Sequence, residues 1–92
     1  MSPEIEGLAN SIDETATLLD ASAEGHWAHW LREAARFLRK GDLFGAEHLL
    51  SAYGGMGSFN DINLPNAGDN ARLGSLRSAL YTQAKSLLRA QA

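Results

Sequence analysis

Apolar side chains recur at every third or fourth position in four stretches of the chain, which is the spacing of one face of an α-helix. This pattern predicts helices over about residues 3–20, 23–40, 43–53 and 71–90. Ser22 is expected to cap the second helix, Asp42 the third, and Asp69 or Asn70 the fourth. Valine is absent, whereas alanine and leucine occur 15 and 14 times, a composition that favours helices over sheets.

A glycine-rich loop, residues 54–69, separates the third and fourth predicted helices. Loops of this length are uncommon in compact domains unless they are functional or disordered. Four apolar residues favour an ordered loop that is pinned to the core; these are Met56, Phe59, Ile62 and Leu64. Ser58 and Asp61 have the spacing of a helix cap, so a single helical turn is expected there. The whole chain, residues 1–92, is therefore expected to be one all-α domain, a small four-helix bundle with an ordered glycine-rich loop between helices three and four.

Charged residues are segregated along the chain, whose formal net charge is −3. In the first helix an acidic stripe recurs every seven residues and consists of Glu6, Asp13 and Asp20. It is either a solvated face or a surface for a basic partner. In the second helix a basic stripe lies nearly opposite the apolar face and consists of Arg32, Arg36, Arg39 and Lys40. This stripe is a solvated face, a seat for the acidic stripe or a track for phosphates. We do not expect nucleic acid there, because the chain is acidic overall and carries no DNA-binding motif.

The glycine-rich loop is the best candidate for a binding site. Its glycines allow positive φ angles and expose backbone N–H groups, and its asparagines offer both hydrogen-bond donors and acceptors. The segment matches neither a Walker A loop nor an EF-hand, so it is either a binding surface or a turn whose side chains satisfy the backbone. Together with the acidic stripe it supplies the predicted partner-binding residues, which are Glu6, Asp13, Asp20, Gly55, Met56, Ser58, Asn60, Asp61 and Asn63.

Three histidines, His26, His29 and His48, would come together if the second and third helices pair. No His-Glu-x-x-His motif is present, so we expect polar rims on an aromatic core rather than metal ligands. That core is expected to contain Trp27, Trp30, Phe37, Phe44, Tyr53 and Phe59. Ser58 has no Gly-x-Ser-x-Gly setting and the chain has no cysteine, so neither an enzyme activity nor a cofactor is expected.

Two stretches of the sequence together carry a family resemblance. They are His26-Trp-Ala-His-Trp-Leu-Arg with Lys40-Gly-Asp-Leu-Phe-Gly-Ala, and Leu49-Leu-Ser-Ala-Tyr-Gly-Gly-Met-Gly-Ser-Phe-Asn-Asp-Ile. Over about residues 26–90 the chain resembles a small bacterial all-helical family of unknown function with a Gly-Gly-Met-Gly-Ser-Phe-Asn-Asp signature. By analogy with other small acidic bacterial proteins, the resemblance suggests an immunity protein, which blocks a toxin by covering its active site.

The expected function is protein binding, most concretely as an immunity or inhibitor protein that binds and blocks a bacterial toxin. The alternative is a small-ligand or metal-binding protein that uses residues 54–66 and the nearby histidines. Leu18 and Phe37 are expected to be exposed and would suit a homodimer interface. No apolar stretch is long enough to span a membrane and no signal peptide is visible, so a cytoplasmic location is expected.

Overall fold

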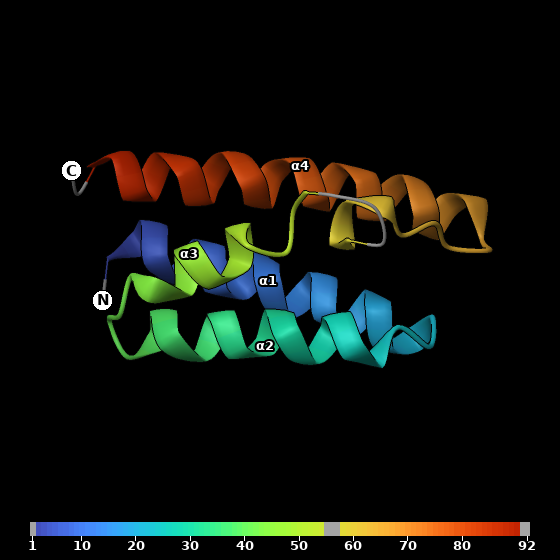
Figure 1. Cartoon of the computed structure of the whole chain (residues 1–92), viewed down its shortest axis with the longest axis horizontal. Coiled ribbons are helices and arrows are strands. Elements are labelled where there is room, and N and C mark those ends of the chain that lie inside the picture. The colour runs from blue at the N-terminus through green and yellow to red at the C-terminus, as the bar shows by residue number, and fades with distance from the viewer. Residues whose placement is uncertain (1, 55–57, 91–92) are drawn as a thin grey trace.

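Four helices and one short 3-10 helix make up the fold, which we describe from a computed structural model (Figure 1). The structure describes residues 2–54 and 58–90. In chain order the elements are α1 (Pro3–Ala21), α2 (Gly25–Arg39), α3 (Phe44–Leu50), η1 (Phe59–Asp61) and α4 (Ala67–Ala90). No strand occurs among the described residues, and the helices pack against one another, so the predicted all-α, four-helix fold is confirmed.

The residues at the two ends of helix α1 have the conformations and hydrogen bonds that helix ends require. The Ser2 hydroxyl accepts a hydrogen bond from the Ile5 N–H at 3.2 Å, and Pro3 occupies the first turn, where its missing N–H costs nothing. At the other end Ala23 takes a left-handed conformation with φ of 61°, which turns the chain back toward α2. The prediction that Ser22 caps α2 is wrong, because its hydroxyl donates to the Leu18 carbonyl at 3.0 Å and so belongs to the end of α1.

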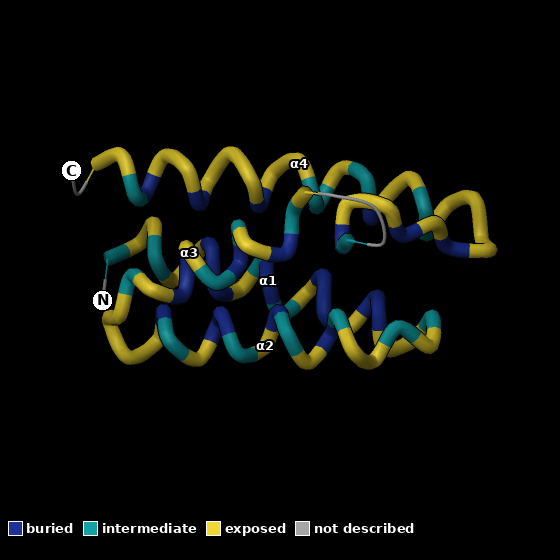
Figure 2. Tube along the Cα trace, in the orientation of Figure 1, coloured by how far each residue is buried: buried dark blue, intermediate teal, exposed yellow. Residues whose placement is uncertain are grey.

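The core lies between the inward faces of all four helices, as the buried segments in Figure 2 show. Its largest fully buried side chains come from every helix and from η1, and they include Leu8, Ile12, Leu19, Leu31, Leu38, Leu49, Phe59, Leu73 and Leu80. Leu18 is only 7% exposed, so the expectation that it is available for a dimer interface is wrong. Thr15 is buried too, and its hydroxyl is satisfied by the Ser11 carbonyl one turn earlier, at 2.8 Å.

A tight turn joins α2 to α3 and makes the two helices neighbours. Gly41 supplies the positive φ, 79°, that this turn requires. The Asp42 carboxylate then accepts a hydrogen bond from the Phe44 N–H at 2.9 Å, but the N-cap residue of α3 is Leu43, so the predicted cap is one residue too early. Helix α3 is shorter than the predicted 43–53, because it ends at Leu50 and the Ser51 hydroxyl donates to the His48 carbonyl at 2.6 Å.

Helix α4 begins at Ala67, four residues before the predicted start at 71. The Asn66 side-chain oxygen accepts from the Asp69 N–H at 2.9 Å, which is the bond that an N-cap residue makes. Asp69 and Asn70, the predicted caps, therefore lie inside the helix. Asn70 has another role, since its side-chain oxygen accepts from the Leu64 N–H at 2.8 Å and ties the preceding loop to the helix.

Candidate functional site

The loop between α3 and α4 is folded around a buried aromatic ring. Phe59 is fully buried, and Ile62 and Leu64 are less than a tenth exposed. The Phe59 N–H donates to the Ala52 carbonyl at 3.1 Å, and the Ser58 hydroxyl accepts from the Asn60 N–H at 3.2 Å. The predicted helical turn exists as η1, and three of the predicted anchors, Phe59, Ile62 and Leu64, are buried as expected. Of the predicted anchors and site residues in this loop, Gly55 and Met56 lie outside the described residues.

Arg77 fastens this loop to the middle of α4. Its Nη1 donates to the carbonyl oxygens of Phe59 and Ile62, at 3.1 and 2.8 Å. From the α3 side, the Tyr53 hydroxyl donates to the Arg77 carbonyl at 2.7 Å. Burial raises the pKa of the Tyr53 hydroxyl, and the neighbouring Arg77 charge opposes part of that shift. Sequence reasoning missed these roles, because the partners are 15 to 24 residues apart along the chain.

Three of the predicted partner-binding residues of the loop project from this fixed frame. Asn60, Asp61 and Asn63 are exposed, and Ser58 is half-buried. The loop therefore has an apolar inner side that anchors it and a polar outer side that a partner can reach.

A row of aromatic rings continues from the buried Phe59 across α2 and α3. Trp27 lies 5.9 Å from Phe59 between ring centroids and 6.1 Å from Trp30. Trp30 stacks on His48 with centroids 4.1 Å apart, and its indole N–H donates to the His48 carbonyl at 3.0 Å. We call the rings of Trp27, Trp30, Phe37, Phe44 and His48 the aromatic row.

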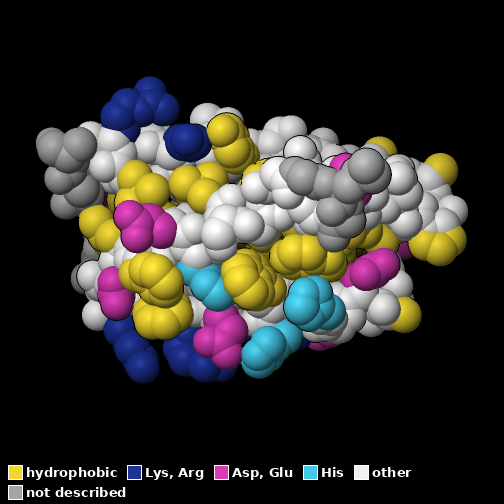
Figure 3. All heavy atoms as spheres, viewed as in Figure 1, with side chains coloured by type: hydrophobic (Ala, Val, Ile, Leu, Met, Phe, Trp, Pro, Cys, Tyr) yellow, Lys and Arg dark blue, Asp and Glu magenta, His cyan; other side chains and the backbone are white. Residues whose placement is uncertain are grey.

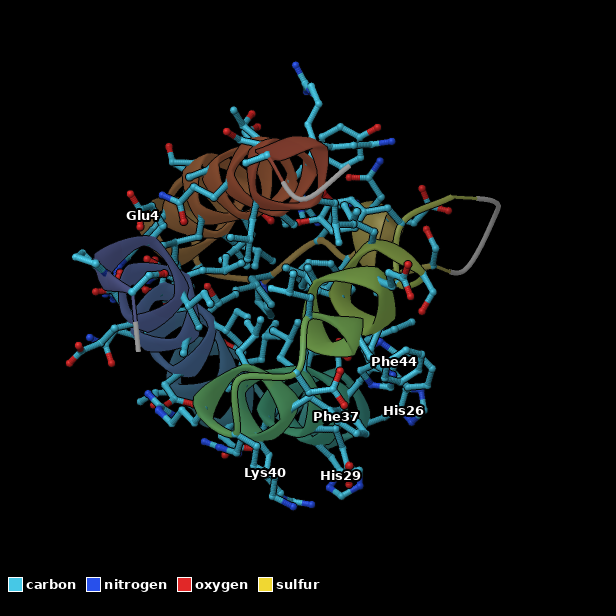
Figure 4. All side chains as sticks on the ribbon, turned by 90° about the vertical axis from the view of Figure 1, so that its left-hand side faces the viewer. Glu4, His26, His29, Phe37, Lys40 and Phe44 are labelled. Carbon is cyan, nitrogen blue, oxygen red and sulfur yellow. The ribbon has the colours of Figure 1, made fainter. Side chains whose placement is uncertain are left out.

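The aromatic row lies at the edge of the core, because Trp27 and Trp30 are partly buried and pack against the core while Phe44 is exposed. Among its far members, Phe37 and Phe44 meet edge to face at 5.0 Å between centroids. Phe44 is 47% exposed, whereas Trp27, Trp30 and Phe37 are half-buried. Hydrophobic and histidine side chains accordingly gather along one face, over α2 and α3 (Figure 3). Phe44 and His26 lie on the same side of the molecule as the α3–α4 loop (Figure 4). The predicted core position is thus confirmed for Phe59 and wrong for Phe44.

The two charged stripes face each other across α1 and α2. Arg39 pairs with Asp13 at 2.6 Å, and Arg32 pairs with Asp20 at 2.5 Å. The interpretation of the basic stripe as a seat for the acidic stripe is confirmed for these two pairs. Arg36 instead contacts Glu33 on its own helix, at 3.5 Å. Lys40 and Glu6 form no ion pair with any residue that the structure describes.

Three carboxylates beside the aromatic row have no such partner. Among the described residues, Glu24, Asp42 and Glu47 make no ion pair. Glu47 follows Phe44 by three residues within α3, so the two lie on the same helix face, and Glu24 is the N-cap residue of α2, three residues before Trp27. Three carboxylates close to the row along the chain thus form no ion pair with a described residue.

The structure does not bring the three histidines together. His29 pairs with Glu33 on the same helix at 3.2 Å, and His26 lies edge-on to Trp27. The Nε2 atom of His48 is buried and has no hydrogen-bond partner among the described residues. Within residues 2–54 and 58–90, no group of three or more histidine or acidic side chains is placed to hold a metal ion.

The fold and this surface define a small all-α domain of four helices whose α2, α3 and following loop carry an exposed aromatic face. The chain belongs to the family described as a domain of unknown function, DUF6966, whose model matches residues 20–71. The match spans α2, α3 and the loop, and thus all of the aromatic row. No curated protein and no solved structure matches the chain. None of the described helices is both long enough and apolar enough to cross a membrane.

Proposed function

We propose that this domain is a protein-binding module whose recognition surface is the aromatic row together with the outer side of residues 58–63. The observation that carries the proposal is a connected set of aromatic rings that reaches the surface, in which Phe44 is 47% exposed and Trp27, Trp30 and Phe37 are partly exposed. Aromatic side chains are enriched at protein interfaces and supply most hot spots there.

The border of the row indicates the chemistry of the partner. Glu24, Asp42 and Glu47 leave three carboxylates available beside exposed rings. Negative charge next to aromatic faces favours arginine and lysine side chains, which pair with carboxylates and also rest on the rings. The partner we propose therefore presents a basic surface around an apolar side chain that packs against Phe44 and Phe37.

In this proposal the acidic stripe contributes less to partner binding than the sequence suggested. Asp13 and Asp20 are only half-buried, at 43% and 46% side-chain exposure, but each already pairs with an arginine of α2. A basic partner would have to compete with these internal pairs. Glu6 carries no such pair and stays a candidate contact.

The more specific form of the proposal is an immunity or inhibitor protein that covers the active site of a bacterial toxin. It rests on analogy with other small acidic proteins and on the surface described above. Coexpression with a toxin encoded next to this gene provides the test of that form. Protection of the cells, lost in Phe44→Ala, is the expected result; growth arrest in the presence of the wild-type protein would rule it out.

A matched pair of variants tests the binding surface itself. Among the described residues, Phe44 and Tyr81 are the large hydrophobic residues that are exposed, at 47% and 42%, and only Phe44 belongs to the row. We expect a partner captured from the source cells to be retained by Tyr81→Ala and to bind Phe44→Ala roughly 30-fold more weakly. The complex should also weaken as salt is raised, because charge attraction contributes to it.

Two results would contradict this surface. A partner that binds both variants equally would place the interface elsewhere on the molecule. Failure of the wild-type protein to retain any partner under low-salt conditions would remove the protein-binding function. Thermal unfolding of both variants provides the folding control, and substitution at either exposed site should change stability little.

A further inference from the structure

A groove between the α3–α4 loop and α4 is separate from the aromatic row. Its volume is about 610 Å³, which lies within the usual range for small-molecule sites. One wall is the face of α4 that carries Arg77, Ser78, Tyr81, Thr82 and Lys85. The facing wall includes Tyr53 and Asn60.

The charge of this groove is opposite to that of the whole chain. The chain has a formal net charge of −3, yet Arg77 and Lys85 line the groove and no aspartate or glutamate does. Neither cation forms an ion pair with a residue that the structure describes. A concave site with charge of one sign attracts small ions of the other sign.

The donors in the groove are arranged on one helical face. Ser78 and Thr82 are four residues apart and Lys85 is three residues further, so their side chains lie in line along α4. Arg77 is already held in place by its bonds to the carbonyls of Phe59 and Ile62. The Lys85 ammonium lies 5.5 Å from the centroid of the Tyr81 ring, which lines the same wall.

We propose that this groove binds a small organic phosphate. Two hydroxyl groups, an ammonium and the Asn60 amide supply several donors, and the oxygens of a phosphate group accept from more of them than a carboxylate can. The groove is much larger than an inorganic phosphate ion, and the rings of Tyr53 and Tyr81 with Leu50 offer apolar surface for the rest of the molecule. The groove shares Asn60 with the proposed recognition surface, but none of its residues belongs to the aromatic row, so phosphate binding can be tested separately from the protein-binding function.

Calorimetric titration with two phosphate probes tests the proposal. The probes are adenosine 5′-monophosphate and phenyl phosphate, and their uncharged counterparts are adenosine and phenol. We expect at least one phosphate probe to bind, and its counterpart to bind at least about tenfold more weakly, since bonds to charged groups exceed about 1.4 kcal/mol.

A pair of charge-removing variants locates the site. Lys85→Gln and Arg89→Gln each remove one positive charge from α4, and both residues are exposed, but only Lys85 lines the groove. Lys85→Gln should raise the Kd of the binding probe about tenfold, whereas Arg89→Gln should change it less than about twofold. Phe44→Ala should leave this Kd unchanged whether or not the aromatic row binds a protein.

Three results would overturn the proposal. The first is that neither phosphate probe binds at millimolar concentration. The second is that the uncharged counterparts bind as tightly as the phosphates, and the third is that the two charge-removing variants weaken binding equally. The last result would show that only the general charge of α4 attracts the anion.

Discussion

Arg77 and Tyr53 show how single side chains fix the shape of the candidate site. The Arg77 guanidinium holds two loop carbonyls, and the Tyr53 hydroxyl donates to the Arg77 carbonyl. The ring of Tyr53 also meets Phe59 edge to face, with centroids 5.4 Å apart. One phenol thus contacts both the helix and the buried ring of the loop, so its removal reports on how firmly the loop is held.

The raised pKa of Tyr53 makes the stability of the protein fall at high pH. Above about pH 10 an unfolded tyrosine releases its proton, while the buried hydroxyl of Tyr53 keeps it. The folded state then binds more protons than the unfolded state, so the free energy of unfolding decreases as pH rises. At pH 7 Tyr53→Phe should be about 1 kcal/mol less stable than wild type, because the bond to the Arg77 carbonyl is lost.

Urea unfolding at pH 7 and pH 11 measures both effects. The deficit of Tyr53→Phe should shrink or reverse at the higher pH, because only the wild-type protein loses stability through this group. A deficit that is the same at both pH values would mean that the hydroxyl ionises as readily in the folded state as in the unfolded one.

At the scale of the elements, the close approach of α2 and α3 positions the aromatic row. Gly45 is buried where the two helices meet, and a Cβ atom there would lie 2.5 Å from the Ala34 carbonyl oxygen and 2.7 Å from Leu38 Cγ. A glycine at this point therefore lets α3 lie directly against the α2 backbone. The stack of His48 on Trp30 depends on this spacing.

Gly45→Ala should destabilise the protein by about 1–3 kcal/mol, because a backbone carbonyl cannot move aside as a flexible side chain can. Gly7→Ala is the matched control, since Gly7 is exposed in α1 and a Cβ there would meet nothing within 4 Å. That control should be more stable by about 0.5–1 kcal/mol, owing to the better helix propensity of alanine. Denaturant midpoints decide the matter, and a Gly45→Ala protein as stable as wild type would disprove the close contact.

At the scale of the whole molecule, α1 completes a core that the family-matched segment does not contain by itself. The match begins at residue 20, whereas Ile12, Ala16 and Leu19 are fully buried against the other helices. Helix α1 packs against both α2 and α4. The family-matched segment therefore lacks part of the core of this domain.

Deleting residues 1–19 should abolish cooperative folding. The deletion removes the buried side chains of Leu8, Ile12, Leu18 and Leu19, each worth about 1.5–3 kcal/mol of burial, against a total stability of about 5–15 kcal/mol for a typical domain. Circular dichroism during thermal unfolding of residues 20–92 should show a broad, gradual change. A sharp transition close to that of the full chain would show that the remaining helices make a sufficient core.

Helix positions were predicted well where residues close together along the chain determine them, and less well where contacts between distant residues do. The apolar spacing located α1 and α2 within two residues at each end. The start of α4 was misplaced because Gly68 reads as loop, although Asn66 directly after Pro65 is a local cap signal. Phe44 was predicted to lie in the core because the spacing of apolar residues does not tell how many helices cover a face.

The bonds from Arg77 and Tyr53 to the loop also have a consequence for association. Binding normally costs about 0.5–1.5 kcal/mol for each side chain that must be immobilised at the interface. The backbone of residues 58–63 is already held by α4 in the unbound protein. A partner that binds these residues therefore causes a smaller loss of conformational entropy than it would on a loop that is free to move. Substitution of Arg77, which touches the loop from within, therefore offers a way to change affinity without altering any residue of the contact surface.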